Sequence, residues 1–168
     1  NNLMMLGKWN ATEESILKLS DYPWDWELVS QCSTFKPSEK FLMDNLDKPF
    51  DWWTLSSNEL EAWRSTRLIT QIVGLPHIKE AIDWSEVSSK NQFPLSEYIL
   101  KNLHDEKLNW KKISQRKEIA SLLHTCADKV VWNIVSHEKW FINEDDGALI
   151  ERLKAYKEYL DWSWITEK

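Results

Sequence analysis

The residues whose types could support catalysis or metal binding are two cysteines and four histidines: Cys32, Cys126, His77, His104, His124 and His137. The dipeptide His137-Glu138 begins like the two-histidine zinc motif of metalloproteases, but Phe141 occupies the place of the second histidine. His124 and Cys126 are two positions apart, and that spacing does not put them on one helix face. We therefore expect no metal site and no bound cofactor.

A cysteine nucleophile is a further catalytic possibility. Cys32 could pair with a distant histidine, but no helix-opening glycine turn or flanking signature accompanies it. Cys126 continues an apolar stripe at helical spacing from Ile119, which is typical of a small core residue. We expect a protein that is not an enzyme and has no catalytic residues. A small Cys/His hydrolase stays as the third-ranked function.

Phosphate-binding and calcium-binding loops are also not indicated. The chain has three glycines, at positions 7, 74 and 147, and they are isolated from one another. The acidic run Glu144-Asp145-Asp146 lacks the alternating ligand spacing of a calcium loop, so helix capping by Asp145 or Asp146 explains it better.

The charge balance restricts the class of partner. The chain of 168 residues carries 21 Lys and Arg against 27 Asp and Glu, a formal net charge of −6. Free nucleic acid is therefore disfavoured, although the segment from Lys107 to Lys117, with Lys111 and Lys112, is locally basic. No apolar run is long enough for a membrane span, and no disulfide framework is present, so we expect a cytoplasmic protein. The first residue is Asn1 rather than Met, which suggests a piece of a longer polypeptide.

The elements that would position any site follow a repeated tryptophan motif. Twelve residues are Trp, and six segments align as apolar, Asp or Asn, Trp, two variable positions, aliphatic, Ser or Thr. Val131 replaces the acidic residue in the fifth copy. The shared tryptophans, interpreted as structural, are Trp26, Trp52, Trp84, Trp110, Trp132 and Trp162.

The columns of the motif have a physical explanation. Asp or Asn is a favoured helix N-cap, and the apolar residues before and after it then occupy the two positions of a hydrophobic staple. Trp is expected at the first helical position, packed inward. Ser or Thr could bond back to a helix carbonyl or begin the next link.

Longer amphipathic stretches lie between the motifs, such as Leu60 to Val73, Leu95 to Leu103 and Leu149 to Leu160. Thr12 is a plausible cap for a first helix. We predict an all-α chain of tandem units, each with a short and a long helix. Stacking of such units gives an irregular α-solenoid in one domain over residues 1–168, with a compact helical bundle as the alternative.

The phrases Lys48-Pro49-Phe50-Asp51-Trp52-Trp53-Thr54-Leu55-Ser56 and Tyr22-Pro23-Trp24-Asp25-Trp26 resemble a known repeat class. They are similar to the tryptophan-rich "PWDWxxLS" tandem repeats of giant-virus and other large microbial proteins. The resemblance implies a helical repeat architecture and transfers no catalytic residues.

One column of the motif suggests where a partner binds. The position after the shared Trp is polar in five copies and is Trp53 in the second, so Trp53 is a candidate interface anchor. Trp164 and Trp140 are further candidate contacts, and Lys111 and Lys112 would be the contacts for nucleic acid.

The function expected from these patterns is a non-enzymatic helical repeat module that binds or scaffolds an unidentified protein or peptide. Other domains of the same polypeptide are expected partners, and no membrane association is expected. The alternative is an accessory domain of a nucleic-acid-processing or defence enzyme that contacts nucleic acid.

Overall fold

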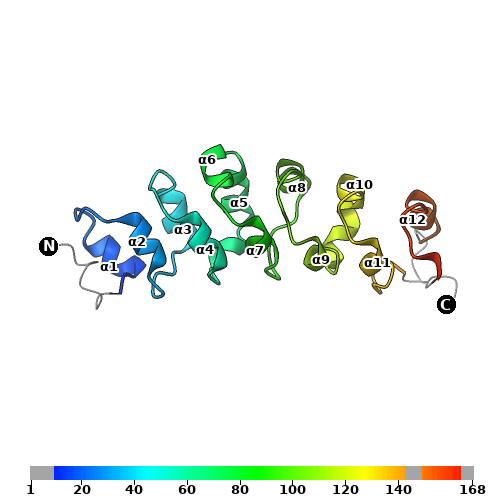
Figure 1. The fold of residues 1–168 in the computed structure, drawn as a ribbon, viewed down its shortest axis with the longest axis horizontal. Coiled ribbons are helices and arrows are strands. Elements are labelled where there is room, and N and C mark those ends of the chain that lie inside the picture. The colour runs from blue at the N-terminus through cyan, green and yellow to red at the C-terminus, as the bar shows by residue number, and fades with distance from the viewer. Residues whose placement is uncertain (1–9, 143–148, 164–168) are drawn as a thin grey trace. The chain divides into compact units, whose positions relative to one another are not determined.

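The fold is seen in a computed structural model, which describes residues 10–142 and 149–163 (Figure 1). Every regular element in these two ranges is a helix, so the predicted all-α class is confirmed. None of the described helices is both long and apolar enough to cross a membrane. The chain divides into two compact units, residues 1–94 and 95–168. The solenoid, the bundle and the single domain over 1–168 stay predictions.

Unit 1 has seven α-helices and one short 3-10 helix among its described residues. They are α1 (Glu13–Lys18), α2 (Trp26–Gln31), α3 (Glu39–Asp44), α4 (Trp52–Ser57), η2 (Glu61–Arg64), α5 (Thr66–Val73), α6 (Pro76–Lys79) and α7 (Trp84–Ser88). The motif helices contact one another in succession, α2 with α4 and α4 with α7, while α3 contacts α5 and α5 contacts α6. Figure 1 shows these two groups on opposite sides of the unit.

Unit 2 continues the alternation of motif helices and second helices. Its described elements are α8 (Glu97–Asn102), α9 (Trp110–Ile113), η3 (Lys117–Leu122), α10 (Leu123–Cys126), α11 (Trp132–Val135) and α12 (Leu149–Ala155). The helices α9 and α11 begin at the motif tryptophans, and the second helices α8 and α10 contact each other.

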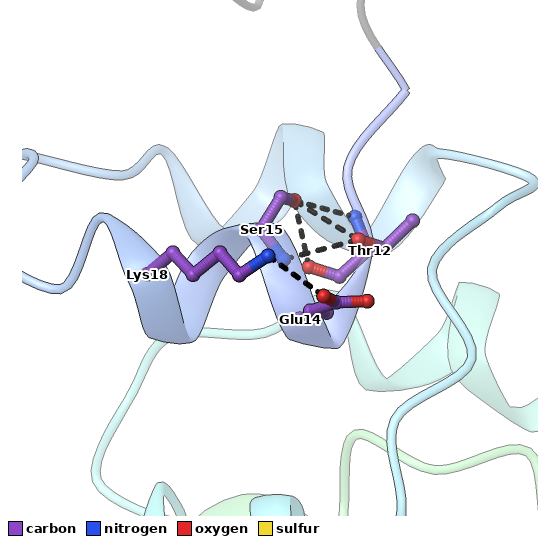
Figure 2. A network of polar contacts seen from close by, with 4 residues as sticks. All are labelled: Thr12, Glu14, Ser15 and Lys18. Atoms are coloured by element: carbon purple, nitrogen blue, oxygen red, sulfur yellow. Dashed lines mark hydrogen bonds and ion pairs between the residues drawn. The ribbon is translucent and has the colours of Figure 1, made fainter.

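Side-chain caps begin many of these helices, as the sequence predicts. Thr12 caps α1 through a capping box, in which its hydroxyl accepts from Ser15 N at 3.1 Å and Thr12 N donates to Ser15 Oγ at 3.0 Å (Figure 2). Lys18 and Glu14 form an ion pair of 2.8 Å on the same helix. The box supplies partners for two backbone N–H groups, those of Thr12 and Ser15, which have no acceptor within the helix. The predicted caps at Asp145 and Asp146 lie outside the described residues.

The prediction of a longer second helix is wrong for the repeat that begins with α2. It holds for the repeats that begin with α4 and α7, where α5 has eight residues against six and α8 has six against five. The second helix α3 has six residues, the same number as the motif helix α2. The stripe from Leu60 to Val73 is divided at Ser65, whose hydroxyl caps α5 by accepting from Leu68 N at 3.0 Å. A Ser that bonds its own following backbone favours a cap over a helix interior, so one apolar stripe yields two helices.

The core of unit 1 is aromatic and aliphatic. Phe35, Phe41 and Phe50 are each at most 6% exposed, and Phe35 packs edge-on against Phe41 with ring centroids 5.8 Å apart. Trp63 is fully buried, and its indole N–H donates to Leu55 O at 3.1 Å, which attaches η2 to the end of α4. The large rings give short helices the buried area that their length does not provide.

Candidate partner-binding surface

We define the cap-helix layer as the three motif helices of unit 1 together with their N-caps. The helices are α2, α4 and α7, and the caps are Asp25, Asp51 and Asp83. Each Asp carboxylate accepts a hydrogen bond from the backbone N–H three residues on, at 3.1 Å in the first two helices and 3.3 Å in the third. Asn109 does the same for α9 in unit 2, at 3.1 Å. The predicted caps are thus confirmed in these four copies.

The fifth copy of the motif lacks the Asp or Asn cap and so tests whether the cap is needed to start the helix. Val131 stands where the other copies have Asp or Asn, and α11 has no side-chain cap. The helix nevertheless begins at Trp132. The staple positions are buried on both sides of the cap in all five fully described copies, as in Phe50 (6% exposed) and Leu55 (0%). Apolar burial therefore fixes the start of the helix, and the Asp or Asn cap adds to it.

The motif Ser joins one repeat to the next. Ser30 Oγ donates to Trp26 O within its own helix at 2.7 Å and accepts from the backbone N–H of Asp51, the next cap, at 3.0 Å. Ser56 repeats the arrangement with Trp52 O at 2.6 Å and Asp83 N at 3.0 Å. Both serines are fully buried.

The same link occurs in unit 2. Ser114 Oγ accepts from Val131 N at 2.8 Å, and Ser136 Oγ accepts from Asp161 N at 3.1 Å. The bond back to a helix carbonyl is one of the two roles expected from the sequence, whereas the bond to the following repeat was not expected. The signal that could have revealed it is a hydroxyl residue in every copy of the motif. An unvarying small polar residue inside an apolar pattern indicates a buried hydrogen bond.

The shared tryptophans differ in burial. Trp52, Trp84 and Trp132 are 4%, 2% and 9% exposed, as expected for inward packing. Trp26 and Trp110 are only half-buried. Trp162 departs from the expectation, because 40% of its surface is exposed.

Part of this difference has a visible cause in unit 2. Trp132 is covered by the rings of Tyr156 and Tyr159, each with its centroid 5.1 Å away. Each of the two tryptophans Trp84 and Trp132 also donates its indole N–H to the carbonyl five residues earlier, at 2.8 Å and 2.7 Å. Trp162 makes the same bond to Lys157 O at 2.8 Å. The position of the indole is therefore set by the preceding turn, whereas its burial depends on what packs over it.

Trp53 is the prominent exposed aromatic residue of the cap-helix layer. It is 63% exposed, whereas its neighbour Trp52 on the same helix is 4% exposed. The two side chains leave the helix about 100° apart, so one faces the core and the other faces solvent. A following helix packed over Trp53 would bury the indole, and the 63% exposure shows that no such packing occurs.

The carboxylate next to Trp53 is held in its ionised form. Burial acts to raise the pKa of Asp51, but hydrogen bonds from the Thr54 hydroxyl, Thr54 N, Gln31 and Trp53 N outweigh it, and the pKa is lowered. The Thr54 hydroxyl lies 2.6 Å and Gln31 Nε2 lies 3.5 Å from Asp51 Oδ2. The start of α4, where Trp53 stands, is thus fixed from within its helix and from the preceding repeat.

The other candidate contacts lie elsewhere. Lys111 and Lys112 are exposed on α9 of unit 2. Trp140 is half-buried in the same unit, and Trp164 lies outside the described residues. A cavity of about 430 Å³ opens beside Trp140 and is lined by Lys117, Glu118, Ala120, Ser121, Trp140 and Arg152. Lys111 and Lys112 are not part of its lining.

The two cysteines and His104 are engaged in local contacts. Cys32 Sγ donates to Leu28 O at 3.4 Å, and Cys126 Sγ to Leu122 O at 3.2 Å. Burial raises the pKa of Cys126 to about 12, with the Asp128 charge adding to the effect, so this thiol stays protonated at neutral pH. His104 Nε2 lies 3.2 Å from Asp128 Oδ2. Within 10–142 and 149–163, no three His, Cys, Asp or Glu residues are grouped as metal ligands.

Comparisons with protein-family models, curated proteins and solved structures found no match for this chain. The function is therefore inferred from the residues themselves.

Proposed function

We propose that this chain is a non-enzymatic helical repeat module that binds a protein or peptide, with Trp53 as the central contact. The observation that carries the proposal is the 63% exposure of Trp53 on a helix whose other Trp is 4% exposed. Tryptophan is among the residues most enriched at the energetic centres of protein interfaces. Burial of a large exposed indole by a partner contributes favourable free energy to binding.

The hydrogen bonds that hold the start of α4 support the same proposal. Its first turn is tied by Asp51 to Thr54 N at 3.1 Å, and Asp51 N is bonded to the buried Ser30 at 3.0 Å. A side chain on a backbone that is already ordered loses less conformational entropy on binding than one on a loop. Trp53 therefore presents a large apolar surface from a backbone that is already ordered.

The non-enzymatic part of the proposal is supported by the roles of the polar side chains. The Asp and Asn residues of the motif accept helix N–H groups, and the motif serines join successive repeats. These contacts account for the polar part of the repeated pattern without any chemistry.

The test is selection of random displayed peptides on the full chain. We expect enriched peptides whose affinity falls by about 30-fold or more with Trp53→Ala, because truncation of a central interface Trp costs 2 kcal/mol or more. Tyr98→Ala is the matched control, since Tyr98 is an exposed aromatic (52%) on α8 and outside the cap-helix layer. The proposal fails if no enriched peptide distinguishes Trp53→Ala from the wild type.

A nucleic-acid-binding role is the second candidate, and the adjacent exposed lysines Lys111 and Lys112 favour it. It predicts binding of a single-stranded oligonucleotide that weakens steeply with salt. It also predicts loss of that binding when both lysines are replaced by Glu. Binding that is unaffected by this double substitution would remove the second candidate.

A further inference from the structure

The charged side chains of the cap-helix layer share one sign. Residues 25–31, 51–57 and 83–88 contain no Lys or Arg. Their carboxylates are Asp25, Glu27, Asp51, Asp83 and Glu86. Two of these, Glu27 and Glu86, are exposed on the helices that contact α4 on either side. Trp53 on α4 thus lies on the middle helix of an acidic layer.

The layer already contains one contact between a cation and a tryptophan. Lys48 Nζ lies over the ring of Trp26, 6.0 Å from its centroid. Lys48 comes from the segment that precedes the cap of α4 and is half-buried. A cation over an indole face is attracted by the negative face of the ring. The contact shows that the layer accommodates an ammonium group over an indole.

The exposed face of Trp53 offers the same chemistry to another molecule. Trp is the strongest aromatic partner for a cation, and arginine is the cation most often found there. Arginine also pairs with carboxylates through its planar set of donors. A segment with spaced basic residues could therefore use the indole and the neighbouring carboxylates at once.

We propose that the cap-helix layer of unit 1 binds an arginine- or lysine-rich segment of a protein partner, with one cationic side chain packed on Trp53 and others paired with Glu27 and Glu86. This inference rests on the proposed function and names the chemistry of its partner.

Other occupants fit the layer less well. An apolar helix needs several anchors at helical spacing, but Trp53 is the one large hydrophobic side chain exposed within the described cap-helix layer. A nucleic acid would bring phosphates towards carboxylates. Unit 1 as a whole has 14 Asp and Glu against 9 Lys and Arg by count of its sequence, so the surrounding field also attracts cations.

The experiment measures fluorescence anisotropy of labelled peptides with the full chain. The probe is an eleven-residue peptide of alternating Arg and Ser, and the matched peptides carry Glu or Gln in place of Arg. We expect binding of the Arg peptide alone, weakening as NaCl is raised. Trp53→Ala should weaken it by about 3- to 30-fold, the range of a cation–π contact, and Trp53→Phe by less.

The carboxylates are tested separately. The double variant Glu27→Gln, Glu86→Gln should weaken the Arg peptide and flatten its salt dependence. Tyr98→Ala with Glu97→Gln is the matched control, because it removes an exposed aromatic and an adjacent carboxylate from α8 and should leave affinity unchanged. Circular dichroism melting of each variant establishes that it is folded.

Several results would overturn the inference. One is Arg-peptide binding that is equal in Trp53→Ala and wild type, since this indicates attraction by net charge alone. Another is Trp53-dependent binding of the Glu peptide or of a single-stranded oligonucleotide. If the Arg peptide does not bind but an uncharged selected peptide requires Trp53, this inference fails and the proposed function stands. If no peptide of any charge requires Trp53, both fail.

Discussion

At the residue scale, the motif serines are buried polar residues whose hydroxyl groups bond backbone atoms of two different repeats. Ser56 is fully buried, and its single hydroxyl donates to Trp52 O and accepts from Asp83 N. One atom thus satisfies two backbone groups that belong to different repeats. Burial of a backbone N–H without a partner is costly, so a hydroxyl is required at this position.

We predict that Ser56→Ala destabilises the chain by about 1–3 kcal/mol, the cost of leaving the Asp83 N–H buried without its acceptor. The measurement is the free energy of unfolding from urea titration. Ser57→Ala is the control on the same helix, because Ser57 is exposed and should change stability by less than about 0.5 kcal/mol. Equal effects of the two substitutions would contradict the role of Ser56 as a link.

The carboxylate of Asp51 gives a prediction about pH. Its pKa is lowered below the ordinary value of 3.8 in the folded chain. Its ionised form therefore contributes stability that is present above pH 3.8 and is lost as pH falls through the lowered pKa. Asp51→Asn keeps a side-chain oxygen for the Thr54 N–H but does not titrate.

We expect the stability advantage of wild type over Asp51→Asn to shrink as pH falls below about 4. Urea titrations of both proteins at pH 6, 4 and 3 measure it. The other carboxylates titrate in both proteins, so their effects cancel in the difference. A difference that stays constant across these pH values would contradict the assignment.

At the element scale, the helices are too short to be stable alone. The motif helices have between four and six residues, while isolated helices below about 12–15 residues are marginal in water. Caps and tertiary packing must therefore provide the stability. The buried motif tryptophans provide much of that packing.

Two tryptophans on neighbouring motif helices should behave in opposite ways. Trp84→Ala should cost about 3–5 kcal/mol, because the ring is 2% exposed and leaves a cavity in the core. Trp53→Ala should cost less than about 1 kcal/mol, because the ring is 63% exposed. Thermal and urea unfolding measure both. A near-zero effect of Trp84→Ala would refute the interpretation of the shared Trp as a core residue.

At the scale of the whole molecule, charge is unevenly divided between the two units. Unit 1 has 14 acidic and 9 basic residues, whereas unit 2 has 13 and 12 by count of the sequence. The net charge of −6 therefore belongs mainly to the unit that contains Trp53. Long-range attraction of cations is expected to be strongest there.

This distribution predicts how ions quench tryptophan fluorescence. Caesium, a cation, should quench the Trp53 emission more efficiently than iodide, because the acidic layer concentrates cations and excludes anions. The Trp53 contribution is the difference between wild type and Trp53→Phe. Acrylamide, which is neutral, gives the accessibility of the ring without charge. Equal caesium and iodide quenching at matched ionic strength would contradict an acidic environment.

The sequence by itself determined the local structure of the repeats. An Asp or Asn cap, an apolar pair around it and the Trp between them are local signals, because each acts within one helical turn. Helix starts at Trp26, Trp52, Trp84, Trp110 and Trp132 follow from them. The exposure of Trp53 followed from its place in a polar column of the motif.

Only the tertiary structure decided the contacts between repeats. The bond from Asp83 N to Ser56 joins residues 27 positions apart, and no local pattern identifies such a partner. The sequence also did not determine the lengths of the second helices or the burial of each shared Trp. The burial of each shared Trp depends on which rings pack over it, as Tyr156 and Tyr159 do over Trp132. Burial is a property of neighbours in space, whereas capping is a property of neighbours in sequence.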